Sequence, residues 1–155
     1  MNTTRRDFIR IGTTALGGVA FAASGTVPPA EGPMVISTWN FGLQANEAAW
    51  KILSAGGRAL DAIEAGARVP ESDPTNTTVG LGGAPDREGH VTLDACIMDE
   101  KGGCGSVVFL EDIEHPISVA RMVMEKTPHV MLAGEGARQF AGERFSQTEV
   151  AYPAI

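Results

Sequence analysis

Residues 81–130 decide the fold of this chain: LGGAPDREGHVTLDACIMDEKGGCGSVVFLEDIEHPISVARMVMEKTPHV. Short β-favouring runs at 79–83, 90–98 and 105–110 are separated by turns that contain Pro, Asp and Gly at favourable positions. Two tight turns that join three short strands predict an antiparallel meander, because parallel neighbours need a long crossover connection.

A helix is predicted directly after these strands, at 116–126. Ile117, Ala120 and Val123 recur at helical spacing on one face. Pro116 falls in the first turn, where its missing N–H costs nothing, and Thr127-Pro128 ends the helix.

Strand and helix signals also flank the central stretch. Residues 34–39 are β-branched and apolar, which predicts a buried strand, and 44–54 and 59–68 carry the helical period. A loop is predicted at 69–78, because its two prolines lack the N–H that a helix uses, and a weaker helix at 132–145. The pattern as a whole indicates an α+β domain.

Composition excludes several kinds of function. The 155 residues carry a net charge of −7, whereas nucleic-acid binding usually shows a basic patch, so no nucleic-acid partner is expected. No stretch is long and apolar enough to remain in a membrane. The three histidines are far apart and no C-x-x-C occurs, so we expect no metal and no cofactor. Cys96 is expected to face a core, with a bridge to Cys104 as the less favoured alternative.

The N-terminus has the features of an export signal. Arg5 and Arg6 are adjacent, Phe8 follows, and a weakly apolar, Gly-containing run leads to the small-residue site Ala-Phe-Ala at 20–22. This order is typical of a twin-arginine signal, which predicts export of the folded protein to the periplasm or beyond. The alternative is a short amphipathic or disordered N-terminus. We therefore assign 1–32 to the signal and a linker.

Three segments carry a family resemblance: STWNFG at 37–42, PDREGHVTLDACIMDE at 85–100 and HPISVARMVMEKTPH at 115–129. They resemble the α-subunit portion of glycosylasparaginases, which are N-terminal-nucleophile hydrolases of the asparaginase type 2 family. The resemblance implies a four-layer αββα sandwich, of which residues 33–145 would supply the incomplete α-subunit half. One departure is Leu81, where the family has an aromatic residue.

The resemblance also implies an activity: cleavage of the amide between Asn and N-acetylglucosamine in a small glyco-asparagine. In that family a precursor cuts itself before a Thr in a His-Asp-Thr motif, and this Thr becomes the nucleophile. No such motif occurs in these 155 residues. We therefore expect no catalytic nucleophile in this chain and a requirement for the β-subunit half. A homo-oligomer of αβ units is left open as one form of the assembled protein.

Three residues are candidates for the substrate pocket or the processing site, all by resemblance. The family places a Trp matching Trp39 beside the catalytic Thr, and an Asp matching Asp94 of the Leu-Asp-Ala motif near the same centre. It tends to have a small hydroxyl residue at the position of Thr78. From composition alone, Trp39 is a core or rim aromatic and Asp94 a solvent-facing or edge-facing residue.

Two further readings of the chain remain open. Residues 146–155, SQTEVAYPAI, do not match the end of an α-subunit, which predicts a truncated or frameshifted product, or an incomplete gene model. Beside a glycosylasparaginase, the chain could be part of a related plant-type L-asparaginase or isoaspartyl peptidase. The other alternative is a non-catalytic remnant. A nucleotide-binding loop at 80–83 fails on glycine spacing.

Overall fold

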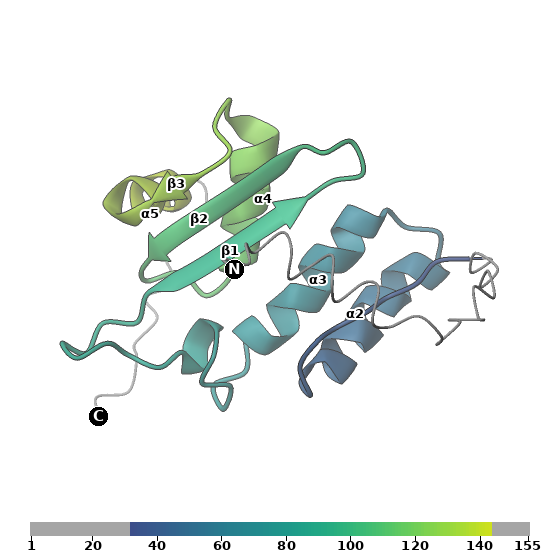
Figure 1. The fold of residues 1–155 in the computed structure, drawn as a ribbon, viewed down its shortest axis with the longest axis horizontal. Coiled ribbons are helices and arrows are strands. Elements are labelled where there is room, and N and C mark those ends of the chain that lie inside the picture. Colours follow the sequence, from purple (N-terminus) through teal and green to yellow (C-terminus); the bar gives the residue numbers. More distant parts are fainter. Residues whose placement is uncertain (1–31, 144–155) are drawn as a thin grey trace, which may run out of the picture. The chain divides into compact units, whose positions relative to one another are not determined.

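A computed structural model describes residues 32–143 and shows a mixed helix-and-sheet fold (Figure 1). The export signal, the tail at 146–155 and the end of the helix predicted at 132–145 lie outside the described residues. The elements in chain order are α2 (Gly42–Ser54), α3 (Ala59–Glu71), the 3₁₀ turn η1 (Gly80–Gly82), β1 (Leu93–Met98), β2 (Cys104–Leu110), α4 (Pro116–Lys126), β3 (Leu132–Ala133) and α5 (Gly134–Gly142).

The predicted β-hairpin is confirmed. β1 and β2 are antiparallel, with Cys96 opposite Ser106 and Met98 opposite Cys104. The turn between them is built by Asp99, whose Oδ1 accepts the N–H groups of Lys101 at 2.9 Å and Gly103 at 2.8 Å. An Asp side chain that binds the backbone two residues on is the mechanism by which Asp favours turns.

The predicted antiparallel meander is wrong in its first strand, 79–83, and the observed third strand lies elsewhere in the chain. The sheet has the order β1-β2-β3, and β3 pairs with β2 in parallel, after the crossover made by α4. The run at 79–83 contains η1 (Gly80–Gly82) instead of a strand, because Gly80 adopts a φ of +63° and lies directly on the backbone of α3. A Cβ at this position would be 1.9 Å from the Glu71 carbonyl oxygen, so only glycine fits.

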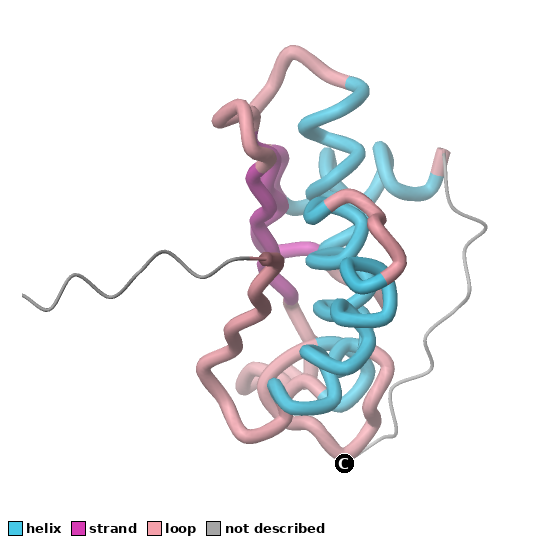
Figure 2. The backbone as a smooth tube through the Cα atoms, turned by 90° about the vertical axis from the view of Figure 1, so that its right-hand side faces the viewer, coloured by secondary structure: helices cyan, strands magenta, loops and turns pink. Residues whose placement is uncertain are grey.

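The core lies between one face of the sheet and α4, with contributions from α3 and α5. Seen along the plane of the sheet, the helices lie to one side of the strands (Figure 2). The sheet and α4 approach closely at Gly105, where a Cβ would be 2.1 Å from the Ala120 carbonyl oxygen. The fully buried core side chains include Leu60, Val107, Leu110, Val119 and Val123.

The opposite face of the hairpin is open. Asp94, Cys96 and Met98 alternate with the buried residues of β1 and are exposed. The prediction that Cys96 faces a core is therefore wrong, because the two-residue period turns it away from Ile97. Both cysteines are free in the described part of the chain. The register places them diagonally, where Cα atoms are typically about 7–8 Å apart, which is beyond the usual disulfide span.

Helix α3 is longer than predicted and is bound tightly to α4. It continues through Pro70 to Glu71, since Pro70 is buried and Glu71 bonds to the first turn of α4. Arg121 of α4, whose side chain is 18% exposed, binds two carboxylates of α3 across this interface, Asp61 and Glu64, each at 2.7 Å. It also binds Glu125 of its own helix at 2.9 Å. The ion pairs of Arg121 with Asp61 and Glu64 therefore hold α3 against α4.

The segment predicted as a buried strand at 34–39 is not one among the described residues. It runs as a dark-blue extended chain along α2 and α3 (Figure 1) and pairs with no strand of residues 32–143. Ser37 donates a hydrogen bond to Asn46 of α2, and Gly42 N–H donates to the Trp39 carbonyl at 2.9 Å. A strand needs a neighbour to accept its backbone bonds, and none is in reach here.

Within residues 32–143, the helices are all too short or too polar to cross a bilayer.

Candidate functional site

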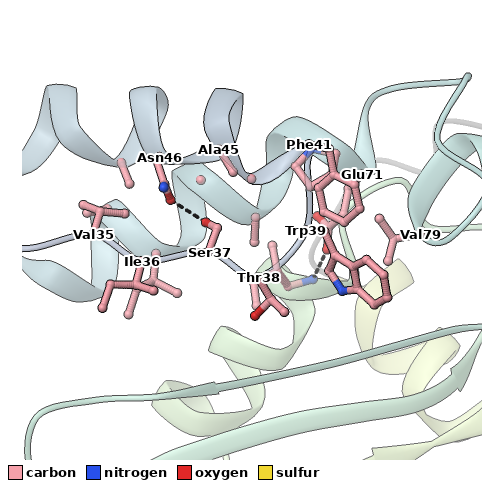
Figure 3. A pocket seen from close by; sticks show the side chains of 18 of the residues that line it. Val35, Ile36, Ser37, Thr38, Trp39, Phe41, Ala45, Asn46, Glu71 and Val79 are labelled. Atoms are coloured by element: carbon pink, nitrogen blue, oxygen red, sulfur yellow. Dashed lines mark hydrogen bonds between the residues drawn. The ribbon is translucent and has the colours of Figure 1, made fainter.

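A cavity of about 570 Å³ lies between segment 34–42, the helices α2 and α3, and the edge strand β1 (Figure 3). Its walls are mostly apolar: Ile36 and Phe41 from the segment, Ala45 from α2, and Ile63 from α3. Polar groups from Asn46, Glu71 and Asp94 also line it. Cavities of this size that combine apolar walls with a few polar groups are typical ligand sites.

Trp39 lies at the mouth of this cavity. It is among the lining residues, and 67% of it is exposed, so of the two positions expected from composition, core or rim, the core is excluded. The short turn in which Gly42 N–H binds the Trp39 carbonyl begins α2 and fixes the position of the indole relative to that helix. An exposed indole at a cavity mouth is able to stack on a ligand.

Asp94 reaches the same cavity from β1. Its Oδ1 accepts the N–H of Phe109 at 2.8 Å, where the register of the hairpin shifts between Leu93 and Ala95. Phe109 has a φ of +55°, an unfavourable conformation for an aromatic residue. This bond joins Asp94 to the partner strand at the point of the register shift, and Asp94 itself is exposed.

Thr78 lies just outside the cavity. Its Oγ1 donates to Asn76 Oδ1 at 2.6 Å, and its neighbour Val79 lines the cavity instead. Asn76 is buried, and its Nδ2 has no hydrogen-bond partner among the described residues. The structure thus brings Trp39 and Asp94 to one cavity and places Thr78 one residue away from it.

Sequence reasoning missed Glu71, the last residue of α3. It is 5% exposed, lines the cavity, and accepts the N–H of Ile117 through Oε1 at 3.1 Å. Burial raises the pKa of this carboxyl, although hydrogen bonds from His115 and Ile117 and the charges of His115 and Arg68 act against the rise. A single Glu after a proline gives no sequence signal of such burial.

The cavity offers no metal site in the described part of the chain. No three His, Cys, Asp or Glu side chains of residues 32–143 converge as metal ligands do. The cavity therefore contributes walls, an indole and two carboxyl groups, one buried and one exposed.

The mixed helix-and-sheet fold is compatible with the family that sequence comparison identifies. A family model described as asparaginase (Asparaginase_2) matches residues 20–151, and the chain belongs to this family of amidohydrolases, as the resemblance to glycosylasparaginases predicted.

Among its relatives, the chain is similar to the N(4)-(beta-N-acetylglucosaminyl)-L-asparaginase of Elizabethkingia miricola, at 57% identity over 149 residues. That match covers 91% of this chain and 44% of the relative. The enzymes of the same name from Mus musculus and Rattus norvegicus are 48% and 47% identical over 110 residues, covering 70% of this chain and 32% of each relative. The chain thus spans less than half the length of these relatives.

Proposed function

We propose that this chain supplies the α-subunit half of a glycosylasparaginase, an amidohydrolase that cleaves the amide between Asn and N-acetylglucosamine. The observation that carries the proposal is the meeting of Trp39 and Asp94 at one cavity, in a chain 57% identical to an N(4)-(beta-N-acetylglucosaminyl)-L-asparaginase. The assignment to glycosylasparaginases within the asparaginase family rests on the motifs quoted above from residues 37–42, 85–100 and 115–129.

The nucleophile is an N-terminal Thr supplied by the β-subunit half. A neutral hydroxyl is a weak nucleophile, and the α-amino group of the same Thr, with an ordinary pKa of about 8, is available to accept its proton. The Thr oxygen attacks the side-chain amide carbon of the substrate, the C–N bond breaks with transfer of the proton to the departing nitrogen, and water then hydrolyses the aspartyl ester. This chain contributes the wall at Trp39.

The second half also completes the fold in this proposal. β1 is an edge strand with an open face, segment 34–39 lies extended without a strand partner among the described residues, and Met34, Ile36 and Trp39 are largely exposed. Open edges and exposed apolar side chains favour association. Their pairing with the β-subunit half would give the four-layer αββα sandwich, and αβ units could then associate further. We also propose export to the periplasm through the twin-arginine signal, on the strength of Arg5, Arg6 and Phe8.

The test is complementation with a relative. The chain is co-expressed with the C-terminal part of the Elizabethkingia miricola enzyme, and the purified pair is assayed on N-acetylglucosaminyl-asparagine, free asparagine and an isoaspartyl dipeptide. We expect hydrolysis of the glyco-asparagine. Hydrolysis of only the isoaspartyl dipeptide would identify the plant-type asparaginase alternative. A stable but inactive pair would identify a non-catalytic remnant.

A matched pair of substitutions then tests the cavity. Trp39→Ala is expected to reduce kcat/KM by roughly one to two orders of magnitude, the scale of one lost packing contact in a transition state. Trp50→Ala removes the second tryptophan of the chain, which is 47% exposed on α2 and is not among the cavity residues, and activity should stay within twofold. Equal losses in both variants would contradict the role of Trp39.

A further inference from the structure

The C-terminus of α3 meets two other elements at one end of the cavity. Glu71 ends α3, η1 begins nine residues later at Gly80, and the first turn of α4 contains Ile117. Glu71, Val79 and Ile117 all line the cavity. Figure 3 places Glu71 and Val79 at the same end as Trp39 and Phe41.

The Glu71 carboxylate holds α4 at its N-terminus. Oε1 accepts the Ile117 N–H at 3.1 Å, and Ile117 is the second residue of α4. The first N–H groups of a helix lack partners within the helix and carry partial positive charge, so a carboxylate stabilises them. A side chain from α3 therefore provides the cap of α4.

A chain of polar groups connects Glu71 with the surface. Glu71 Oε2 lies 3.3 Å from His115 Nδ1, and His115 Nε2 lies 3.4 Å from Glu114 Oε1. Glu114, which is about one-third exposed, also accepts a hydrogen bond from Ser72 Oγ at 2.8 Å. The imidazole lies between two carboxyl groups, one buried at the cavity and one at the surface.

The backbone of Glu71 fixes the opposite element. A Cβ on Gly80 would be 1.9 Å from the Glu71 carbonyl oxygen and 2.3 Å from its Cα, so η1 lies in direct contact with this residue. Val79 precedes η1 and points into the cavity in Figure 3. A displacement of Glu71 should therefore displace both Ile117 and Val79, because closely packed interiors transmit displacements.

We propose that Glu71 is a positioning residue of the candidate site: through Ile117 and Val79 it fixes the end of the cavity beside Trp39, and it does so in its ionised state. The identification of this cavity as the amidohydrolase site rests on the proposed function above. The charged form binds the Ile117 N–H and faces His115, whereas the neutral form loses most of that attraction.

The charged and titratable groups that face Glu71 are few. α4 presents His115 at its N-cap, with Glu114 behind it, and α3 itself presents Arg68. η1 and segment 34–42 contain no ionisable side chains. Of the described residues that line the cavity, Asp94 and Cys96 are the other titratable ones, both on β1. Burial raises the pKa of Glu71, so its charge changes above the usual value of 4.5.

The test is a pH titration by ¹⁵N–¹H NMR of the 155-residue chain labelled at Trp and Ile, in an Asp94→Asn background that removes the other cavity carboxyl. The Ile117 amide reports the capping bond, and the Trp39 indole reports the cavity end. Trp50 supplies a reference indole in the same spectrum. We expect the Ile117 and Trp39 signals to move with one common midpoint above 4.5, while the Trp50 signal stays constant.

Glu71→Gln should abolish both movements and leave both signals at the low-pH positions of the parent, because a neutral amide oxygen still accepts the Ile117 N–H. Glu88→Gln, in an exposed turn, should leave the titration unchanged. A constant Trp39 signal in the parent, or an unaltered titration in Glu71→Gln, would overturn the proposal.

A second variant covers the case in which Glu71→Gln does not fold. His115→Ala keeps Glu71 and its bond to Ile117 but removes a group that lowers its pKa, so the common midpoint should move to higher pH. An unchanged midpoint would contradict the proposal. None of these measurements reads activity, so a failure here leaves the amidohydrolase assignment standing, and an inactive complemented enzyme leaves the positioning role of Glu71 testable.

Discussion

Replacement of Gly105 by alanine is expected to separate the sheet from α4. The added Cβ would lie 2.1 Å from the Ala120 carbonyl oxygen and 2.6 Å from the Met124 nitrogen, both backbone atoms of α4. Real Cβ contacts essentially never fall below 3.0 Å, so the carbonyl must retreat by roughly 0.9 Å. Because the atoms in the way belong to a helix backbone, no side-chain rotation can relieve the clash.

The energetic cost follows from what such a retreat disturbs. α4 contributes Val119, Ala120 and Val123 to the core, all of them fully buried. Overpacking a core usually costs about 1–3 kcal/mol, and a displaced helix axis belongs at the upper end, so we expect a loss of about 3 kcal/mol of unfolding free energy. Urea denaturation followed by circular dichroism measures this difference as a shift in midpoint.

Gly136→Ala is the matched control. Gly136 lies inside α5, and a Cβ there would meet no atom of the described residues within 4 Å. The same chemical change should stabilise the chain by about 0.5–1 kcal/mol, because alanine is the better helix former. Opposite signs for the two variants are therefore predicted. A Gly105→Ala chain as stable as its parent would refute the close approach of β2 and α4.

Substitutions at three further residues, Arg121, Asp94 and Glu71, test the contacts around the core and the cavity. Arg121→Ala should destabilise the chain by about 1–2 kcal/mol, since it removes the shared cation of three partly exposed carboxylates. Arg87→Ala, at a largely exposed pair, should stay within about 0.5 kcal/mol in the same denaturation assay. Asp94→Ala should cost about 1–2 kcal/mol by removing the acceptor of the Phe109 N–H, and Asp94→Asn should cost less because it keeps an acceptor oxygen; equal losses would argue against the bulge contact. The folded-state pKa of Glu71 lies above its usual value of 4.5, so the stability that the protonated carboxyl contributes is complete below about pH 4.5 and is lost as the pH rises through the folded-state pKa. Glu71→Gln should therefore gain stability relative to the parent across that window. A constant difference between the two urea midpoints would contradict the burial of the charge.

Local signals in the sequence predicted the helices well. The limits of α4 agree with the prediction at both ends, because Pro116 starts the helix and Thr127-Pro128 stops it through backbone chemistry that needs no distant partner. Helix α2 and the β1-β2 hairpin follow equally local rules, a helical period and an Asp-led turn. Pro70 misled the prediction, since tertiary contacts of Glu71 outweigh its missing N–H.

Elements that depend on distant partners could not be predicted. β3 is two residues long and exists because β2 lies beside it. Residues 34–39 have the composition of a strand but lie beside helices, and composition does not reveal whether a neighbouring strand is present.

The candidate site likewise contains residues that could be predicted from the sequence and one that could not. Trp39 and Asp94 could be predicted through motifs that resemble a known family, and the structure places both at the cavity. Thr78 came from the weakest part of that resemblance and lies one residue outside it. Glu71 could not be found, because its importance comes from burial and from contacts to residues more than forty positions away.

The parallel pairing of β2 with β3 has a consequence for the order of folding. β2, α4 and β3 form one βαβ unit within residues 104–133. The contacts of this unit therefore join residues that are close together in the sequence. Units with local contacts form quickly, and loop closure over longer separations comes later. Segment 34–39, by contrast, is separated from β1 by more than fifty residues. The sheet is therefore expected to assemble first, and the Trp39 side of the cavity is expected to be the last part to take its place.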